Sequence, residues 1–260
     1  MDGCLQRIIE RLPFEYNDYN FLSFIGQGTY SVVFEVTKSS WKNRRCAAKI
    51  TYTDDSFDLE SGYLHEAELD ALMSLHHPNI IRLFDYFLST NLTLLEATYD
   101  HEIKSIQDES QIYQLTAQLE KEKAEFTPIH NYVIVMILNY CPYGTLEQYF
   151  NDSDSFTLSD FNDEPNLELT RKSSGNRTFM CDSSLNISST GMNIDTLTFL
   201  QNLMLFSNIV SALYVCHTQG IAHRDLKPAN IFIDNYKRAI VADFGLASIQ
   251  TNSVDTACGS

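Results

Sequence analysis

The stretch His223–Gly245, HRDLKPANIFIDNYKRAIVADFG, decides the fold of the second half of this chain. It begins with a short polar loop that carries Asp225 and continues into two apolar runs, 231–233 and 239–242. Apolar runs of this length, separated by turn-forming polar residues, predict a β-hairpin with a solvated turn. A second carboxylate, Asp243, follows the second run directly. We therefore expect two acidic side chains, one from each end of the hairpin, in one polar site.

The polar residues of this stretch suit phosphoryl transfer from a nucleotide. Carboxylate and amide oxygens, here those of Asp225, Asn230 and Asp243, can hold magnesium and position a hydroxyl nucleophile. An ordinary hairpin with a solvated loop is the alternative, and it would account for HRD or DFG alone. The longer match, H-R-D-L-x-x-x-N followed by D-F-G, resembles the catalytic and metal-binding loops of the eukaryotic protein kinases.

The composition is that of a globular protein. The 260 residues are 44% hydrophobic, which allows one large domain or two lobes. The net charge of −16 argues against nucleic-acid and membrane partners, because both require a basic surface. No apolar run approaches the length of about 20 residues that spans a bilayer, and the N-terminus lacks the apolar core of a signal peptide. We expect a cytoplasmic or nuclear protein whose six scattered cysteines are reduced.

A glycine-bearing turn, 26–31, joins two expected strands, 21–25 and 32–36. Glycine lets the main chain approach closely, so such a turn can lay backbone N–H groups over nucleotide phosphates. A dinucleotide-binding motif would need a helix after the turn, whereas β-branched residues follow here and favour a strand. As G-x-G-x-x-S-x-V the segment resembles the glycine-rich loop of kinases, with Ser31 in place of the third glycine.

Lys49 lies inside the apolar strand pattern 45–50. Taken alone, such a lysine more often reaches to solvent at a strand end than pairs inside the protein. A partner is present, however, because residues 63–76 have helical periodicity and carry two glutamates. In kinases the strand lysine binds the α- and β-phosphates and pairs with a glutamate of this helix. The resemblance assigns that role to Glu68, with Glu66 as the second choice.

The fourth and fifth strands are expected at 80–87 and 132–138. The insertion between them, about 89–130, is longer than hairpin loops allow, and its part 107–125 has the composition of a helix. The resemblance makes Leu138 the gatekeeper before a hinge whose backbone meets adenine. Asn139 stands where kinases often have glutamate, and because backbone contacts do not depend on the side chain, we expect no effect from this change.

The second half begins with a short helix at 145–150. Residues 151–193 are rich in Ser, Asn and Asp without apolar periodicity, which predicts a disordered insertion. Residues 196–218 form the strongest helical pattern of the chain. Because apolar residues lie on nearly all its sides, we expect the central buried helix of the second lobe.

The resemblance implies an α+β, bilobal, protein-kinase-like fold. Its first lobe would hold an antiparallel five-stranded sheet plus one helix, and its second lobe would be mainly helical and incomplete. The expected domains are a helical extension at 1–18, in which 4–12 form a helix, a first lobe at 19–141 and a partial second lobe at 142–260.

The resemblance also assigns roles. Asp225 would accept the proton of a substrate hydroxyl, Asn230 and Asp243 would hold Mg²⁺, and Lys227 would neutralise the transferred γ-phosphoryl group of ATP. Lys227 is typical of kinases that act on serine or threonine hydroxyls of protein substrates. The remaining ATP contacts are expected from Ile25, Gly26, Gln27, Gly28, Thr29, Tyr30, Ser31, Val33, Ala47, Lys49, Leu138, Asn139, Tyr140, Cys141 and Phe232. Regulatory roles fall to Arg224, Phe244, Gly245 and the candidate phosphorylation sites Thr251, Ser253 and Thr256.

The chain ends at Ser260, before an A-P-E motif and the helices that follow it in kinases. We expect that this leaves one face of the helix 196–218 partly uncovered and that the chain is a fragment of a longer kinase. The alternative is a nucleotide-binding pseudokinase or scaffold without turnover. The insertion before the fifth strand resembles the kinases of translation initiation factor 2, while HPNIIRL and the CGS ending resemble the calmodulin-dependent group, and both assignments stay open.

Overall fold

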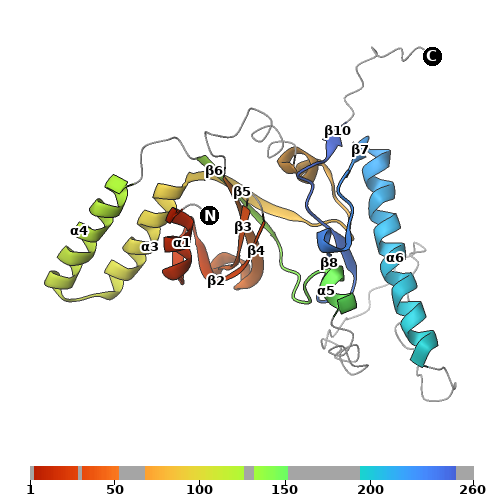
Figure 1. Ribbon diagram of the computed structural model, residues 1–260, viewed down its shortest axis with the longest axis horizontal. Coiled ribbons are helices and arrows are strands. Elements are labelled where there is room, and N and C mark those ends of the chain that lie inside the picture. The colour runs from red at the N-terminus through yellow and green to blue at the C-terminus, as the bar shows by residue number, and fades with distance from the viewer. Residues whose placement is uncertain (1–2, 29–30, 53–67, 126–131, 152–193, 250–260) are drawn as a thin grey trace, which may run out of the picture.

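The chain forms two lobes in the computed structural model, a sheet with helices at one side and a smaller lobe along a long helix (Figure 1). The expected fold class, α+β and bilobal with an incomplete second lobe, is confirmed. The structure describes residues 3–28, 31–52, 68–125, 132–151 and 194–249.

The first lobe is built on a six-stranded sheet in the order β1-β2-β3-β4-β6-β5, in which every neighbouring pair is antiparallel. The prediction of five strands missed β1, which is too short to show an alternating pattern. Asn17 and Asp18 turn it into the next strand with φ of 50° and 65°, a conformation that these residues tolerate. The strands are β1 (Phe14–Tyr16), β2 (Tyr19–Gln27), β3 (Ser31–Lys38), β4 (Arg44–Tyr52), β5 (Leu83–Thr90) and β6 (Tyr132–Asn139).

The fourth expected strand is displaced. It was predicted at 80–87, but β5 runs from Leu83 to Thr90. The residues before it bond to the second lobe instead: Ile81 N–H donates to the Val241 carbonyl, and Val241 N–H donates to the Asn79 carbonyl, each at 2.8 Å. The apolar residues at 80 and 81 therefore belong to the junction between the lobes, which a single-sheet pattern does not reveal.

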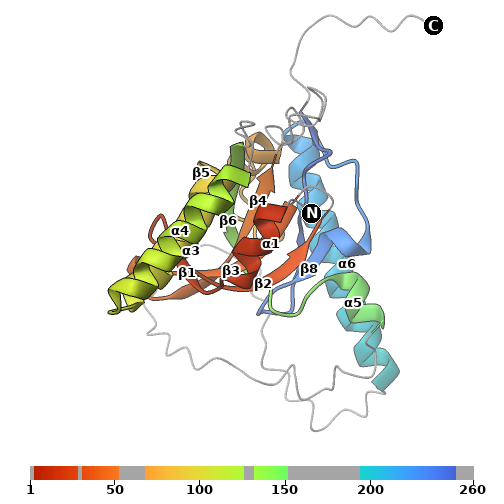
Figure 2. The same ribbon diagram turned by 60° about the vertical axis from the view of Figure 1, so that its left-hand side comes forward.

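Three helices lie at one side of the sheet, and two of them were expected (Figure 2). The helix predicted at 4–12 is α1 (Gly3–Glu10), and the one predicted at 107–125 is α4 (Glu109–Glu125). The insertion contains a further helix, α3 (Asn91–Ser105), which the sequence interpretation missed. A threonine before the helix, Thr90, was the available sequence signal for its start, since threonine is a common N-cap residue. In the structure the Thr90 side chain accepts a hydrogen bond from Thr93 N–H at 3.0 Å.

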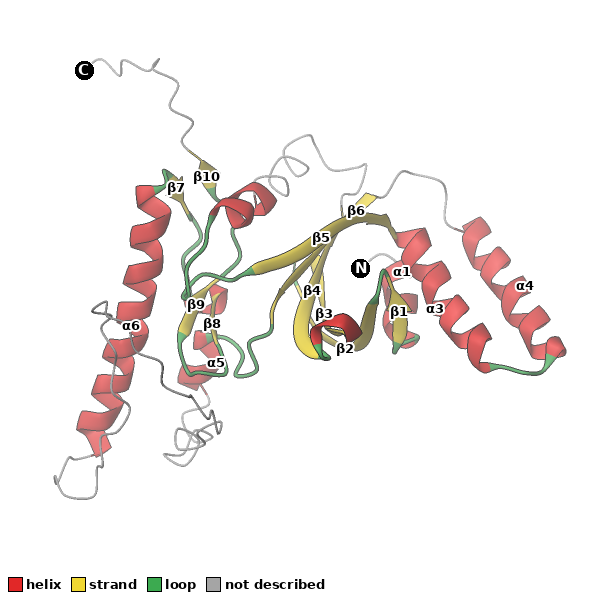
Figure 3. Ribbon diagram, turned by 180° about the vertical axis from the view of Figure 1, so that it is seen from behind, coloured by secondary structure: helices red, strands yellow, loops and turns green. Residues whose placement is uncertain are grey.

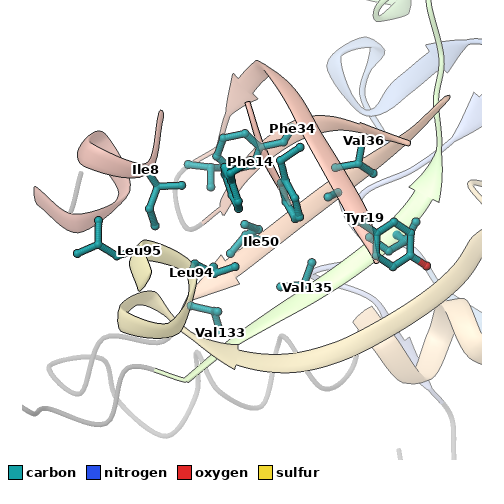
Figure 4. Packing of buried hydrophobic residues seen from close by; sticks show 14 of the residues in the cluster. Ile8, Phe14, Tyr19, Phe34, Val36, Ile50, Leu94, Leu95, Val133 and Val135 are labelled. Carbon is teal, nitrogen blue, oxygen red and sulfur yellow. The ribbon is translucent and has the colours of Figure 1, made fainter. Parts of the chain in front are cut away.

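The core of the first lobe lies between the sheet and these helices. Phe14 and Phe21 stack with ring centroids 4.7 Å apart, and Leu94 and Leu95 of α3 are fully buried beside them. Figure 4 shows side chains from α1, α3 and the strands meeting in this space. The insertion therefore completes the core of the first lobe instead of hanging from it.

The second lobe contains the predicted hairpin of β8 and β9, with register Ile231↔Val241. A helical segment at 68–74, the described part of the helix predicted at 63–76, lies at the junction of the lobes. The other elements are η1 (Ser39–Trp41) in the first lobe and α5 (Leu146–Asn151), α6 (Ile194–Thr218), β7 (Ile221–Ala222), η3 (Pro228–Asn230), β8 (Ile231–Ile233), β9 (Ala239–Val241) and β10 (Ser248–Ile249) in the second.

The helix α6 is not the buried central helix that we expected. Leu205, Ala212 and Cys216 are buried, but the described elements all lie on one side of α6 (Figure 3). The partly uncovered face that we expected is present. Its exposed side chains, 47–70% accessible, include Phe199, Leu203, Met204, Phe206, Val210 and Tyr214.

The segment Phe199–Thr218 is long and apolar enough to cross a membrane by length and composition. This corrects the expectation that no apolar run approaches that length. A helix that supports the core of a soluble domain meets the same two criteria, and α6 does pack on β9.

Candidate active site

Lys49 forms the centre of a charged cluster between the lobes. Its Nζ donates to both carboxylate oxygens of Glu68, at 2.7 and 2.9 Å, and to Asp243 Oδ1 at 3.1 Å. The Lys49 side chain is 14% exposed and that of Glu68 is 3% exposed. The predicted pairing with Glu68 is therefore present in the structure, whereas the second choice, Glu66, lies outside the described residues.

The charge state of Lys49 follows from these contacts. Burial lowers its pKa, because a low dielectric disfavours the cation, but the charges and hydrogen bonds of Glu68 and Asp243 outweigh burial and raise it. Lys49 is therefore a fixed cation at physiological pH, aimed between a carboxylate from each lobe.

Asp225 lies in a loop whose geometry is set by Lys227 and Asn230. Lys227 Nζ donates to Asp225 Oδ2 at 2.8 Å, and Asn230 Nδ2 donates to the same oxygen at 2.9 Å. The hydrogen bond from Lys227 is the main reason why the Asp225 pKa lies below its usual value. A carboxylate held ionised in this way can accept a hydrogen bond or a proton.

Two non-glycine residues at the site have left-handed backbone. Arg224 has φ of 65° and Asp243 has φ of 63°. Such conformations cost free energy and persist where surrounding contacts impose them, most often at functional sites. Here a hydrogen bond at 2.9 Å from Ala242 N–H to the Asn230 carbonyl connects the chain before Asp243 to the loop that carries Asp225.

His223 and Phe244 contact both the loop that carries Asp225 and the chain around Asp243. The buried His223 contacts the Ala242 carbonyl through Nε2 at 2.9 Å, while its Nδ1 accepts from Asp225 N–H at 3.3 Å. These partners assign the proton to Nε2. The Phe244 ring, fully buried, lies 4.7 Å from the His223 ring and in one cluster with Leu72. Phe244 therefore connects the segment at 68–74 to the loop that carries Asp225.

The glycine turn is closed by a hydrogen bond at 2.7 Å from Gly28 N–H to the Ser31 carbonyl. A Cβ at Gly28 would lie 2.9 Å from Ser31 Oγ, so a larger residue there would have to displace the serine. Ile25 is exposed at the end of β2, and a Cβ at Gly26 would meet open space. Thr29 and Tyr30 lie outside the described residues. The turn thus leaves room above the β2–β3 hairpin.

The hinge follows β6. Leu138 is nearly buried and pairs with Ala47 across the strands, while Val33 pairs with Lys49 on the other side of β4. Burial raises the pKa of the Cys141 thiol to about 12, so this cysteine is a neutral thiol. Half-buried Phe232 packs against the same cluster. Ala47, Leu138 and Cys141 of the first lobe thus share one apolar cluster with Phe232 of the second lobe.

Asn139 does more than the sequence interpretation assigned to it. Its Oδ1 accepts from Arg82 N–H at 2.6 Å, and its own N–H donates to the Arg82 carbonyl at 3.1 Å. The side chain thus bonds to β6's neighbouring segment directly before the register shift in β5 between Leu83 and Asp85. The expectation that this change leaves the backbone contacts with adenine unaffected stays a prediction, and the side chain has a further role because it fastens the hinge to the neighbouring strand.

Asn230 and Asp243 suit a Mg²⁺ ion. Asn230 Nδ2 is used by Asp225, whereas Asn230 Oδ1 accepts no hydrogen bond within the described part of the chain. One amide and one carboxylate oxygen are a normal protein share for Mg²⁺, which keeps water and phosphate ligands besides. Among the described residues, no group of three or more His, Cys, Asp or Glu side chains could hold a metal ion by itself.

The structure leaves the predicted regulatory contacts open. Arg224 is exposed, and its suggested partners Thr251, Ser253 and Thr256 lie outside the described residues. A Cβ at Gly245 would lie 3.6 Å from Asp243 Oδ1, an ordinary van der Waals contact.

Sequence reasoning missed further residues that hold the site. Asp234, expected in a solvated turn, is 4% exposed and accepts from Tyr236 N–H and Arg238 N–H at 2.9 Å and from the Arg238 guanidinium. Asn79 Nδ2 donates to the Ala239 carbonyl at 3.0 Å. The pattern D-x-x-x-R within a turn was the available signal for Asp234.

Comparison with known proteins gives matches to the part of the chain that carries Asp225 and Asp243. Residues 183–260 match the family model of the protein kinase domain. A probable serine/threonine-protein kinase KCC4 of Saccharomyces cerevisiae is 44% identical over 57 residues, which are 21% of this chain and 6% of that protein. The carbon catabolite-derepressing protein kinases of Candida glabrata and Saccharomyces cerevisiae are each 47% identical over 57 residues, 21% of this chain and 9% of theirs. The matched part is thus less than a tenth of the length of these relatives.

Proposed function

We propose that this chain is a eukaryotic protein kinase and that it transfers the γ-phosphoryl group of ATP to serine or threonine hydroxyls of proteins. The observation that carries the proposal is the meeting of two clusters, Lys49 with Glu68 and Asp243, and Asp225 with Lys227 and Asn230. They come from both lobes and are tied by the bond between Ala242 and Asn230.

In this proposal Asp225 accepts the proton of the attacking hydroxyl. The hydroxyl oxygen forms a bond to the γ-phosphorus while the bond from that phosphorus to the bridging oxygen breaks and ADP leaves. Lys227, which is exposed and 2.8 Å from Asp225, is placed to neutralise charge on the transferring group.

Lys49 binds the α- and β-phosphates in the same proposal. Its contact with Asp243 at 3.1 Å is longer than its contacts with Glu68, so Glu68 holds the cation while Asp243 can turn to another cation. Asn230 and Asp243 would hold Mg²⁺, which supplies charge neutralisation of the phosphates when bound.

The serine/threonine class rests on Lys227 and on the name of one similar yeast protein, a probable serine/threonine-protein kinase. The apolar frame of Ala47, Leu138 and Phe232 suits an adenine ring.

A phosphorylation assay tests the proposal. The chain is incubated with labelled ATP, Mg²⁺ and a mixed serine/threonine peptide library, beside Asp225→Asn and the exposed control Asp100→Asn. We expect transfer by the parent chain and by Asp100→Asn, and loss of at least about a hundredfold for Asp225→Asn. Transfer that Asp225→Asn does not diminish would contradict the assignment. A thermal shift with Mg-ATP but no transfer would instead support the alternative, a nucleotide-binding pseudokinase or scaffold.

A further inference from the structure

A hollow of about 770 Å³ lies on the hinge, between the start of β4, the chain before β5 and the turn of the β8–β9 hairpin. Of the residues that we assign to ATP, it includes Asn139 and Tyr140, while Lys49, Asp225 and Asp243 do not line it. It is therefore a second concave surface, separate from the charged clusters of the proposed active site.

Four arginines line this hollow, in a chain whose net charge is −16. Arg45 pairs with Glu35, and Arg238 pairs with Asp234. Arg44 and Arg82 have no carboxylate partner among the residues that the structure describes. The hollow is thus a positive site on an acidic protein, and two of its cations are available to a ligand.

The two available guanidinium groups are held in place by one ring. Arg44 lies 4.4 Å and Arg82 5.4 Å from the centroid of Phe84. Stacking on a ring fixes the plane of a guanidinium group but leaves its N–H edges able to grip a carboxylate with two hydrogen bonds. Little side-chain entropy is then lost when an anion binds.

The rest of the lining is mixed, with polar His76, His77, Asn139, Asp234 and Asn235 beside apolar and aromatic residues. Pro78, Ile80 and Pro142 contribute apolar surface, and Tyr236 at the rim is 58% exposed. A ligand that suits this surface combines carboxylates with an aromatic or aliphatic side chain between them.

We propose that this hollow binds an acidic peptide segment of a partner protein, with its carboxylates on Arg44 and Arg82 and an apolar side chain over the prolines. A nucleic acid fits less well, because its many phosphates would meet the field of a chain with 34 acidic and 18 basic residues. A short peptide contributes few charges and an apolar contact. This inference does not depend on catalytic activity.

Fluorescence anisotropy tests the proposal with a labelled probe peptide, Gly-Glu-Glu-Phe-Glu-Glu-Gly, and a matched peptide in which glutamine replaces every glutamate. The variants are Arg44→Glu with Arg82→Glu and the control Lys104→Glu with Lys121→Glu, which makes the same charge change on the exposed faces of α3 and α4. We expect the acidic probe to bind the parent chain at least tenfold more tightly than the glutamine probe. The arginine variant should lose at least tenfold in affinity, and the lysine control less than twofold.

Thermal denaturation shows whether each variant is folded. If the charge reversal unfolds the chain, Arg44→Gln with Arg82→Gln replaces it and should still lose at least fivefold. Equal losses in the arginine and lysine variants would overturn the proposal, because they would indicate general electrostatics. Equal binding of both probes would overturn it as well, and so would an RNA oligonucleotide that displaces the acidic probe better than the unlabelled peptide does.

Discussion

Removal of the Glu68 carboxylate is the most direct test of how the two lobes are held together. In Glu68→Leu, Lys49 keeps its burial and loses its two shortest contacts, at 2.7 and 2.9 Å, while the contact at 3.1 Å leads to Asp243, whose side chain is 45% exposed. Breaking a buried ion pair by removing one partner costs about 3–5 kcal/mol. Because Lys49 retains Asp243, we expect the low end, about 3 kcal/mol, or about 6–12 °C in Tm for a domain of this size.

The double variant separates the pair from its environment. When Lys49→Met accompanies Glu68→Leu, no unpaired charge stays in the site, and the cost should fall to within about 1 kcal/mol of the parent chain. A matched control is Glu120→Leu, which removes an exposed partner of Lys123 and should cost no more than about 0.5 kcal/mol.

The pH of the measurement follows from the pKa of Lys49. Since that pKa is raised in the folded chain, the stabilisation from the pair is fully present below the ordinary lysine value and is lost as pH rises through the folded value. Urea denaturation between about pH 7 and pH 9 should therefore give a constant cost. A cost below about 1 kcal/mol for Glu68→Leu, or additive costs in the double variant, would refute this account of the cluster.

Three further outcomes are expected. Asn139→Ala removes the bond at 2.6 Å from Arg82 N–H and should cost about 1–2 kcal/mol in urea denaturation, with faster hydrogen exchange at that amide; unchanged exchange would contradict the bond. Asp234→Ala leaves two backbone N–H groups and Arg238 without their acceptor and should lower the free energy of unfolding by about 2–3 kcal/mol. The control Asn235→Ala, at the exposed neighbouring residue, should lower it by less than about 0.5 kcal/mol, and equal losses would contradict the role of Asp234. The hydrogen bond from Lys227 chiefly lowers the pKa of the Asp225 carboxyl, so this carboxylate contributes stability above its ordinary pKa that is lost as pH falls through the folded pKa. In an NMR titration, Lys227→Met should raise the titration midpoint of Asp225. An unchanged midpoint would show that Lys227 does not cause the lowered pKa.

The sequence predicted those parts of the site that depend on local order. Asp225, Lys227 and Asn230 lie within a few residues of one another, so a short motif was enough to place them in one loop. For Lys49, helical periodicity at 63–76 indicated a glutamate partner, and the resemblance to kinases selected Glu68 rather than Glu66.

The parts that could not be predicted depend on contacts between distant segments. Asn79 bonds to a carbonyl 160 positions away, and no local pattern distinguishes that amide from a surface asparagine. Residues 80 and 81 have the pattern of a strand start, but they form backbone contacts with Val241 of β9 instead of joining the sheet of the first lobe. The exposure of Phe206 and its neighbours on α6 could not be read from a pattern that is apolar on nearly all sides, because burial depends on which other elements are present.

The loop that carries Asp225 is held from the side of α6 that packs on β9 and not from its apolar outer face. Asn208 Oδ1 accepts from Ala239 N–H at 3.1 Å, which fixes the start of β9, and Ser211 Oγ lies 3.2 Å from Nε2 of His77. From β9 the chain reaches Ala242, whose carbonyl and N–H hold His223 and Asn230. The contacts made by Asn208 and Ala242 are hydrogen bonds between described residues, and none of them involves the exposed apolar side chains of α6. The geometry around Asp225 is therefore set by polar contacts that are already complete, while the outer face of α6 contributes apolar surface and no positioning contact within the described chain.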